Sequence, residues 1–208
     1  MLVSLKELME DAEKGGYAVG AFNVSNLESL MAIMQAAEET GRGVILNYAE
    51  VHAPFLSMEQ AALIMLDAAK KAKVPVCVHL DHGSSMESCI QAIRLGFTSV
   101  MLDASAEDYE TNVRETKEIV RLAHSVGVTV EAELGHIFSS DMGLAESPKE
   151  AETLESFDSA EDVYTDPATA KDFVERTGVD VLAIAFGTTH GIYTKKPKLD
   201  LERITKIK

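Results

Sequence analysis

Several residue types are rare in this chain, and each shortage excludes some classes of protein. Its 208 residues include two cysteines, five prolines and no tryptophan. Cys77 lies in an apolar run and Cys89 in a helical pattern, which predicts buried thiols in a reducing compartment rather than a disulfide framework. No apolar run approaches the roughly 20 residues of a membrane-spanning helix, and no basic stretch precedes an apolar signal core. We therefore expect a cytoplasmic protein without a membrane partner.

Basic residues are also scarce, because nineteen Lys and Arg stand against thirty-four Asp and Glu, for a formal net charge of -15. Such a charge repels nucleic acid and anionic membrane surfaces, so we expect no nucleic-acid partner. A phosphorylated substrate would need local positive charge or a metal ion. Hydrophobic residues make up 46% of the chain, enough to bury a substantial core, and residues 1–208 are expected to form a single domain or most of one.

Short apolar runs alternate along the chain with longer segments of helical period. This alternation predicts βα units around a parallel sheet. The predicted strands are 18–24, 43–49, 74–80, 99–103, 129–134 and 181–186. The predicted helices are 5–14, 26–40, 57–73, 85–95, 106–126, 167–177 and 199–208. Glycines at 41, 96, 127 and 178 follow helices at the positions where C-caps are expected.

Polar residues gather at the carboxyl ends of the predicted strands, and no glycine-rich dinucleotide turn follows the first strand. Both features favour a (β/α)8 TIM barrel over a doubly wound sheet. A complete barrel usually has about 250 residues, and only about six βα units are visible here. An open barrel exposes two sheet edges, so we expect either further residues beyond Lys208 or a second chain that covers the gap. Residues 137–165 are expected to form a loop over the carboxyl face of the barrel. This loop is either a lid or a solvated acidic segment.

Four strand ends supply the candidates for chemistry. Asp81 and His82 end the third strand, Asp103 the fourth, Glu133 the fifth, and His190 the sixth. Two histidines at strand ends can ligate zinc through neutral imidazole nitrogens, and catalytic zinc takes three protein ligands. Asp81 would then move protons beside the metal, a geometry suited to breaking a carbon–carbon bond next to a polarised carbonyl.

Each candidate also has a structural interpretation. Asp103 serves equally well as the cap of the following helix, and either histidine alone is more often a hydrogen-bonded core residue than a ligand. His79 either orients Asp81 or packs in the core. Glu133 is harder to explain structurally, because a buried carboxylate without a cation or donors costs free energy.

No lysine lies within any predicted strand. Cleavage of a carbon–carbon bond through an imine would instead need a desolvated lysine amine at a strand end inside the barrel. The absence favours stabilisation of an enolate by a metal ion over Schiff-base chemistry.

Five motifs in order resemble the class II, metal-dependent ketose-bisphosphate aldolases, the family of fructose- and tagatose-bisphosphate aldolases. They are 20–24 (GAFNV), 79–83 (HLDHG), 99–105 (SVMLDAS), 130–135 (VEAELG) and 185–193 (AFGTTHGIY). The resemblance covers essentially the whole chain. It implies reversible cleavage of a ketose 1,6-bisphosphate to dihydroxyacetone phosphate and an aldehyde through a zinc-stabilised enediolate, in a homo-oligomer that is a dimer or a tetramer.

The resemblance also implies roles for individual residues. Asp81 matches the acid/base that acts on the substrate C4 oxygen, and His82 and His190 match zinc ligands. Asp103 and Glu133 match positions that hold a second or alternate metal. Asn23 and Gly191 match substrate-binding positions, and main-chain atoms around Gly191 match a site for a monovalent cation, Na⁺ or K⁺.

Several features depart from the family pattern. The third zinc histidine and the phosphate-binding loops of the family follow later strands, which do not occur before Lys208. Ala49 stands where the family often has a serine, and the loop glutamate that moves the C3 proton has only Glu146 and Glu150 as candidates. The alternative is a noncatalytic, truncated or split aldolase-like chain that binds phosphate ligands or a partner chain.

Overall fold

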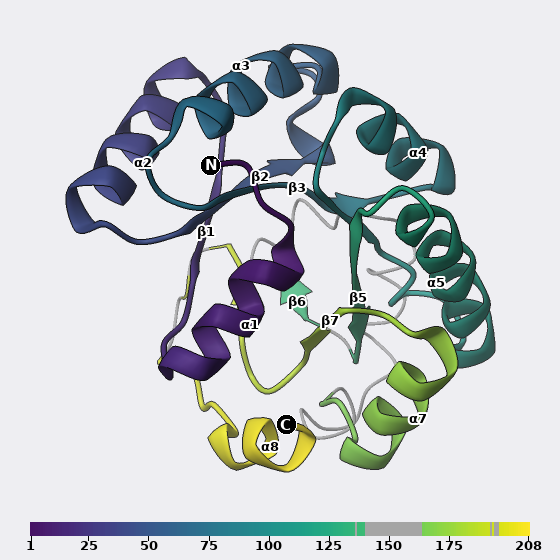
Figure 1. Ribbon diagram of the computed structural model, residues 1–208. Coiled ribbons are helices and arrows are strands. Elements are labelled where there is room, and N and C mark those ends of the chain that lie inside the picture. The colour runs from purple at the N-terminus through teal and green to yellow at the C-terminus, as the bar shows by residue number, and fades with distance from the viewer. Residues whose placement is uncertain (136, 140–163, 192, 194–195) are drawn as a thin grey trace. The chain divides into compact units, whose positions relative to one another are not determined.

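A computed structural model describes residues 1–135, 137–139, 164–191, 193 and 196–208. Helices and strands alternate along the chain (Figure 1). The helices are α1 (Leu5–Gly15), α2 (Leu27–Thr40), α3 (Met58–Lys71), α4 (Met86–Leu95), α5 (Tyr109–His124), α7 (Pro167–Thr177) and α8 (Leu201–Ile207), with a 3₁₀ turn, η1 (Glu50–His52). The strands are β1 (Gly20–Asn23), β2 (Val44–Ala49), β3 (Val76–Gly83), β4 (Ser99–Leu102), β5 (Thr129–Leu134), β6 (Phe138–Ser139), β7 (Val181–Ile184) and β8 (Thr189–His190).

The strands of the larger sheet pair in the order β1-β2-β3-β4-β5-β7, and β6 pairs with β8 in a small second sheet. The pairs from β1–β2 to β4–β5 are parallel. Sequential parallel order joined by helices is the arrangement of βα units in a barrel-type α/β fold. The predicted fold class is therefore confirmed. The chain divides into two compact units, residues 1–103 with 118–131 and residues 104–117 with 132–208.

The first unit contains β1 to β4 and the start of β5. In its centre, β3 is buried along Val76 to Leu80, as a strand covered on both faces should be. Helices α2, α3 and α4 lie side by side along the strands (Figure 1). Both cysteines are buried in this unit, and burial raises the pKa of each thiol to about 12. The prediction that they are core residues is confirmed.

Local sequence explains where the helices of this unit begin and end. Ser4, Asn26 and Ser57 each accept a hydrogen bond from the third backbone N–H of α1, α2 and α3, and the third residue bonds back in a capping box. Gly41 and Gly96 end α2 and α4 in the left-handed conformation that glycine adopts at low cost. These starts and stops agree with the predicted ones to within one or two residues.

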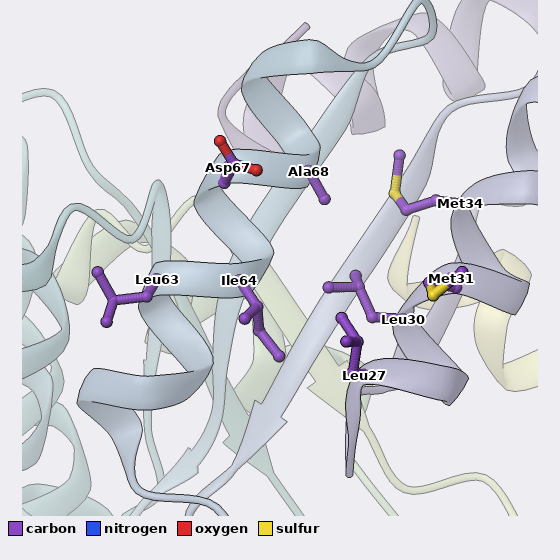
Figure 2. Close-up of a pocket in the computed structure, with 8 residues that line it drawn as sticks. All are labelled: Leu27, Leu30, Met31, Met34, Leu63, Ile64, Asp67 and Ala68. Atoms are coloured by element: carbon purple, nitrogen blue, oxygen red, sulfur yellow. The ribbon is translucent and has the colours of Figure 1, made fainter.

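The outer surface between α2 and α3 carries an apolar groove of about 330 Å³ (Figure 2). The residues that line it are Leu27, Leu30, Met31, Met34, Leu63, Ile64, Asp67 and Ala68. Met31 and Leu63 are 64% and 74% exposed, so the groove is open to solvent. It includes none of the residues at the strand ends.

The second unit contains the end of β5, β7, the small sheet and the start of α5. The Thr165 side chain joins its strands, since its hydroxyl donates to the Leu134 carbonyl and accepts from the Ala185 N–H at 2.8 Å. Asp108 caps α5 by accepting from the Thr111 N–H at 3.1 Å. Helix α5 therefore begins at Tyr109 rather than at residue 106 as predicted, because the capping carboxylate sits just before it.

The end of β3 and a small second sheet also differ from the prediction. Strand β3 continues to Gly83 instead of ending at residue 80, because Gly83 pairs with Leu102 of β4 beyond a register shift. The β6–β8 sheet was not predicted, since two-residue strands have no detectable period. Among the described residues, no helix is both long and apolar enough to cross a membrane.

Candidate functional site

The end of β3 presents Asp81 and His82 through an unusual piece of backbone. His82 has φ +49°, and it is the one non-glycine residue with positive φ in the described part of the chain. Gly83 follows, where a Cβ would lie 2.6 Å from the Met101 carbonyl oxygen of β4. The Gly83 carbonyl in turn accepts from the Asp103 N–H at 3.0 Å. Strained backbone held in this way is typical of functional positions.

His82 and Asp103 form a direct side-chain pair. His82 Nδ1 lies 2.8 Å from Asp103 Oδ2, and His82 Nε2 lies 3.8 Å from Asp81 Oδ1. All three side chains are about one-fifth exposed. A histidine that ligates a metal usually makes a second hydrogen bond to a carboxylate, which fixes the ring orientation. The donor set of one imidazole and nearby carboxylates therefore fits a divalent metal ion, with Asp103 able to orient His82 or to share the ion.

Asp81 receives a hydrogen bond from the neighbouring strand. Asn47 Nδ2 of β2 donates to Asp81 Oδ2 at 3.1 Å, and Asp81 is in register with Ala49. The carboxylate is partly exposed and stands beside His82. A carboxylate in this setting can accept or donate a proton at a bound ligand.

The buried His79 side chain precedes Asp81 by two residues on β3 and contacts polar side chains of β4 and β5. His79 Nδ1 is 2.9 Å from Ser99 Oγ, and His79 Nε2 is 3.3 Å from Glu131 Oε2. Burial lowers the pKa of His79 to about 4 and raises the pKa of Glu131 to about 7, the latter helped by the Asp81 charge. At neutral pH His79 is therefore uncharged, and Glu131 is partly protonated. Of the two roles predicted for His79, packing in the core agrees with its burial, since the residue is 2% exposed.

Glu50 anchors the turn that follows His82. Its carboxylate accepts from the Ser84 N–H at 2.7 Å and from the Ser88 hydroxyl at 2.6 Å. Glu50 thereby links the end of β2 to the first turn of α4, where a negative charge is favourable.

The remaining candidates lie elsewhere in the chain. Asn23 ends β1, is exposed, and is in register with Asn47. In the second unit, Glu133 is 4% exposed and follows Glu131 by two residues, so both point to the same face of β5. His190 lies on β8 opposite Ser139, and Gly191 has φ +80°.

Three residues of the predicted set lie together within the first unit. Asp81, His82 and Asp103 are adjacent in the first unit. The ligand roles of Glu133 and His190, which belong to the second unit, stay predictions, as do the substrate roles of Asn23 and Gly191. The interpretation of Asp103 as the helix cap is wrong, because Asp108 caps α5. Glu146, Glu150 and most of the predicted loop lie outside the described residues.

Sequence reasoning missed the supporting residues Asn47 and Glu50 as parts of the site. A signal for Asn47 was present, since it is an amide inside the otherwise largely apolar strand β2. Glu50 directly follows that strand, but nothing in a single sequence shows which turn its carboxylate reaches.

Comparisons with known proteins identify the family of the chain. A sequence profile described as fructose-bisphosphate aldolase class-II matches residues 3–208. The chain is 46% identical to a fructose-bisphosphate aldolase of Thermus caldophilus, covering 100% of this chain and 65% of that protein. It is 42% identical to a fructose-bisphosphate aldolase of Staphylococcus aureus (strain N315), covering 99% of this chain and 68% of that protein.

Solved structures point the same way. The crystal structure of the YdjI aldolase from Escherichia coli K12 superimposes with a TM-score of 0.84 at 40% identity, covering 100% of this chain and 69% of that one. The chain thus spans about two thirds of the length of its relatives. With its βα fold and its strand-end motifs, it belongs to the class II fructose-bisphosphate aldolase family.

Proposed function

We propose that this chain is a metal-dependent aldolase that reversibly cleaves a ketose 1,6-bisphosphate, of the fructose or tagatose type, to dihydroxyacetone phosphate and an aldehyde. The observation that carries the proposal is Asp81 beside the His82–Asp103 pair at the ends of β3 and β4. Membership of the class II family supports the reaction class.

The proposed site combines a metal centre with a proton-transfer group. His82 and His190 would hold Zn²⁺ through imidazole nitrogens, and Asp103 and Glu133 would hold a second or alternate metal ion. When bound, the metal ion supplies a Lewis acid that polarises the substrate ketone and stabilises the enediolate formed on cleavage. Asn23 and Gly191 would contact the substrate, with a monovalent cation, Na⁺ or K⁺, near Gly191.

Asp81 performs the proton transfer in this proposal. In cleavage it accepts the proton of the C4 hydroxyl, and in condensation it returns that proton to the aldehyde oxygen. The Asn47 amide donates a hydrogen bond to this carboxylate and orients it for the transfer. Its position 3.8 Å from the His82 ring keeps it within reach of a substrate held at the metal.

The decisive experiment measures release of dihydroxyacetone phosphate from fructose and tagatose 1,6-bisphosphates. We expect turnover that a chelator abolishes and added Zn²⁺ restores. Metal content is measured in parallel, because a stoichiometric ion must accompany activity. Turnover that survives chelation, in protein without measurable metal, would exclude the metal-dependent reaction.

Replacement of the acid/base separates proton transfer from metal binding. Asp81→Ala should lower kcat about 10²- to 10⁴-fold while the bound metal per chain stays unchanged. Asp67→Ala is the matched control, since Asp67 is an exposed carboxylate of α3 paired with Lys71 at 2.7 Å. An Asp81→Ala protein as active as the control would remove Asp81 from the mechanism.

The same preparation tests the remaining parts of the proposal. We propose a cytoplasmic homo-oligomer, a dimer or a tetramer, and light scattering on the eluting protein measures its mass. A zinc-loaded wild-type chain without turnover would favour the noncatalytic alternative, a chain that binds phosphate ligands or a partner polypeptide.

A further inference from the structure

Asn47 is a polar residue in the middle of the largely buried strand β2. It is the fourth residue of β2, and the backbone registers place it between Asn23 of β1 and His79 of β3. Its neighbours Leu46 and Tyr48 are fully buried. A polar amide in this position needs hydrogen-bond partners, because burial without them costs free energy.

The NH₂ group of the Asn47 amide has a hydrogen-bond partner, the Asp81 carboxylate. Its Nδ2 donates to Asp81 Oδ2 at 3.1 Å. An ionised carboxylate only accepts hydrogen bonds, so the NH₂ group must face it and the amide oxygen must face elsewhere. That oxygen, Oδ1, is buried and has no hydrogen-bond partner among the described residues. The acceptor therefore stands close to the proposed acid/base with its lone pairs unused.

We propose that Asn47 is a positioning residue for Asp81 and that its Oδ1 accepts a hydrogen bond from a hydroxyl of the bound carbohydrate. The donor group of the amide holds the carboxylate in one orientation, and the acceptor group recognises a polyhydroxylated substrate. This inference rests on the proposed function for its catalytic part. Asn47 of β2 would thus help to align the substrate hydroxyl with Asp81, the carboxylate that takes its proton.

Two variants separate the hydrogen bonds of Asn47 from its packing. Asn47→Ala removes both the donor and the acceptor. Asn47→Asp keeps the shape and the acceptor but removes the donor and places a second carboxylate against Asp81. Gln91→Ala is the matched control, because Gln91 Nε2 of α4 also donates to a carboxylate, Glu59 Oε1 at 2.6 Å, on the exposed outer helices.

The kinetic test measures kcat and KM for ketose bisphosphate cleavage by the metal-loaded full chain. Loss of a hydrogen bond to a charged group corresponds to a kcat decrease of about 10- to 100-fold in Asn47→Ala, with a raised KM from the lost acceptor. Asn47→Asp should lose at least as much kcat despite its preserved shape. Gln91→Ala should stay within about twofold of wild type. Wild-type kcat in both Asn47 variants would overturn the inference.

A second measurement tests the positioning role of Asn47 and does not depend on enzyme turnover. Crystal structures of the metal-free wild-type and Asn47→Ala proteins allow the Asp81 rotamer to be compared directly. We expect the carboxylate to leave its wild-type rotamer or to occupy several rotamers in the variant. An unchanged Asp81 rotamer would overturn the positioning role, whereas an inactive wild-type chain would count against the proposed function alone.

Discussion

Gly83 shows how a single residue without a side chain shapes the site. A Cβ at this position would lie 2.6 Å from the Met101 carbonyl oxygen and 2.9 Å from Leu80 Cδ2. Close approach of β3 and β4 here supports the turn that carries His82. The glycine of the HLDHG motif is therefore required by packing between the strands.

We expect Gly83→Ala to lower the free energy of unfolding by about 2–3 kcal/mol, because backbone atoms must move to admit the methyl group. Urea unfolding at pH 7 measures the change. Gly127→Ala is the control, since Gly127 has φ +76° but no atoms near an added Cβ, and it should cost about 1 kcal/mol. Equal losses in the two variants would mean that crowding at Gly83 is unimportant.

His79 gives the first unit a pH dependence of predictable sign. Burial lowers its pKa from 6.5 to about 4, so between these values the unfolded chain binds more protons than the folded chain. The stability that comes from neutral His79 is complete above pH 6.5 and is lost as the pH falls toward 4. Glu131, whose pKa is raised from 4.5 to about 7, has the opposite effect, because its contribution is lost as the pH rises through that range.

A comparison of wild type with His79→Gln isolates the histidine, because Glu131 is present in both proteins. We expect wild type to lose about 2 kcal/mol of stability relative to the variant between pH 7.5 and pH 5. Urea unfolding of metal-free protein at both pH values measures the difference. A stability difference independent of pH would show that His79 protonates equally well in the folded protein.

At the scale of single elements, the helix ends follow local rules. Ser57 begins α3 with a capping box, in which Ser57 Oγ accepts from the Gln60 N–H and Gln60 Oε1 accepts from the Ser57 N–H, both at 3.3 Å. Such caps use residues within one turn of the chain. For this reason the starts of α1, α2 and α3 were predictable from sequence.

Ser57→Ala should lower the free energy of unfolding by about 1 kcal/mol, because the first turn of α3 loses its side-chain acceptor. Ser57→Gly should cost only a few tenths of a kcal/mol, since glycine lets solvent reach the same N–H groups. Thermal or urea unfolding of the three proteins measures both values. If alanine and glycine proved equivalent, the cap would contribute nothing to stability.

At the scale of the whole molecule, the net charge of -15 opposes the folded state through self-repulsion. We expect the unfolding midpoint to rise when NaCl increases from 10 to 200 mM, because the screening length falls from about 30 Å to less than 10 Å. A gain of about 1 kcal/mol corresponds to roughly 2–4 °C. KCl should act equally, and a midpoint that stays constant or falls would show that repulsion is unimportant.

The sequence by itself determined the order of the βα units, most helix ends, the class of fold and the identity of the strand-end motifs. These properties depend on periodicity, on caps within one turn and on short motifs such as residues 79–83, all of which involve residues close together along the chain. The adjacency of Asp81 and His82 was likewise predictable, because they are consecutive residues.

Only the tertiary structure decided which side chains pair across strands. The Asn47–Asp81 and His79–Glu131 contacts join residues 34 and 52 positions apart, and they depend on the register of neighbouring strands. The left-handed backbone of His82 and the anchoring of Ser84 by Glu50 depend on the same packing. Strands buried on both faces have no alternating pattern that would specify their register, so the pairs that support the site follow from the fold alone.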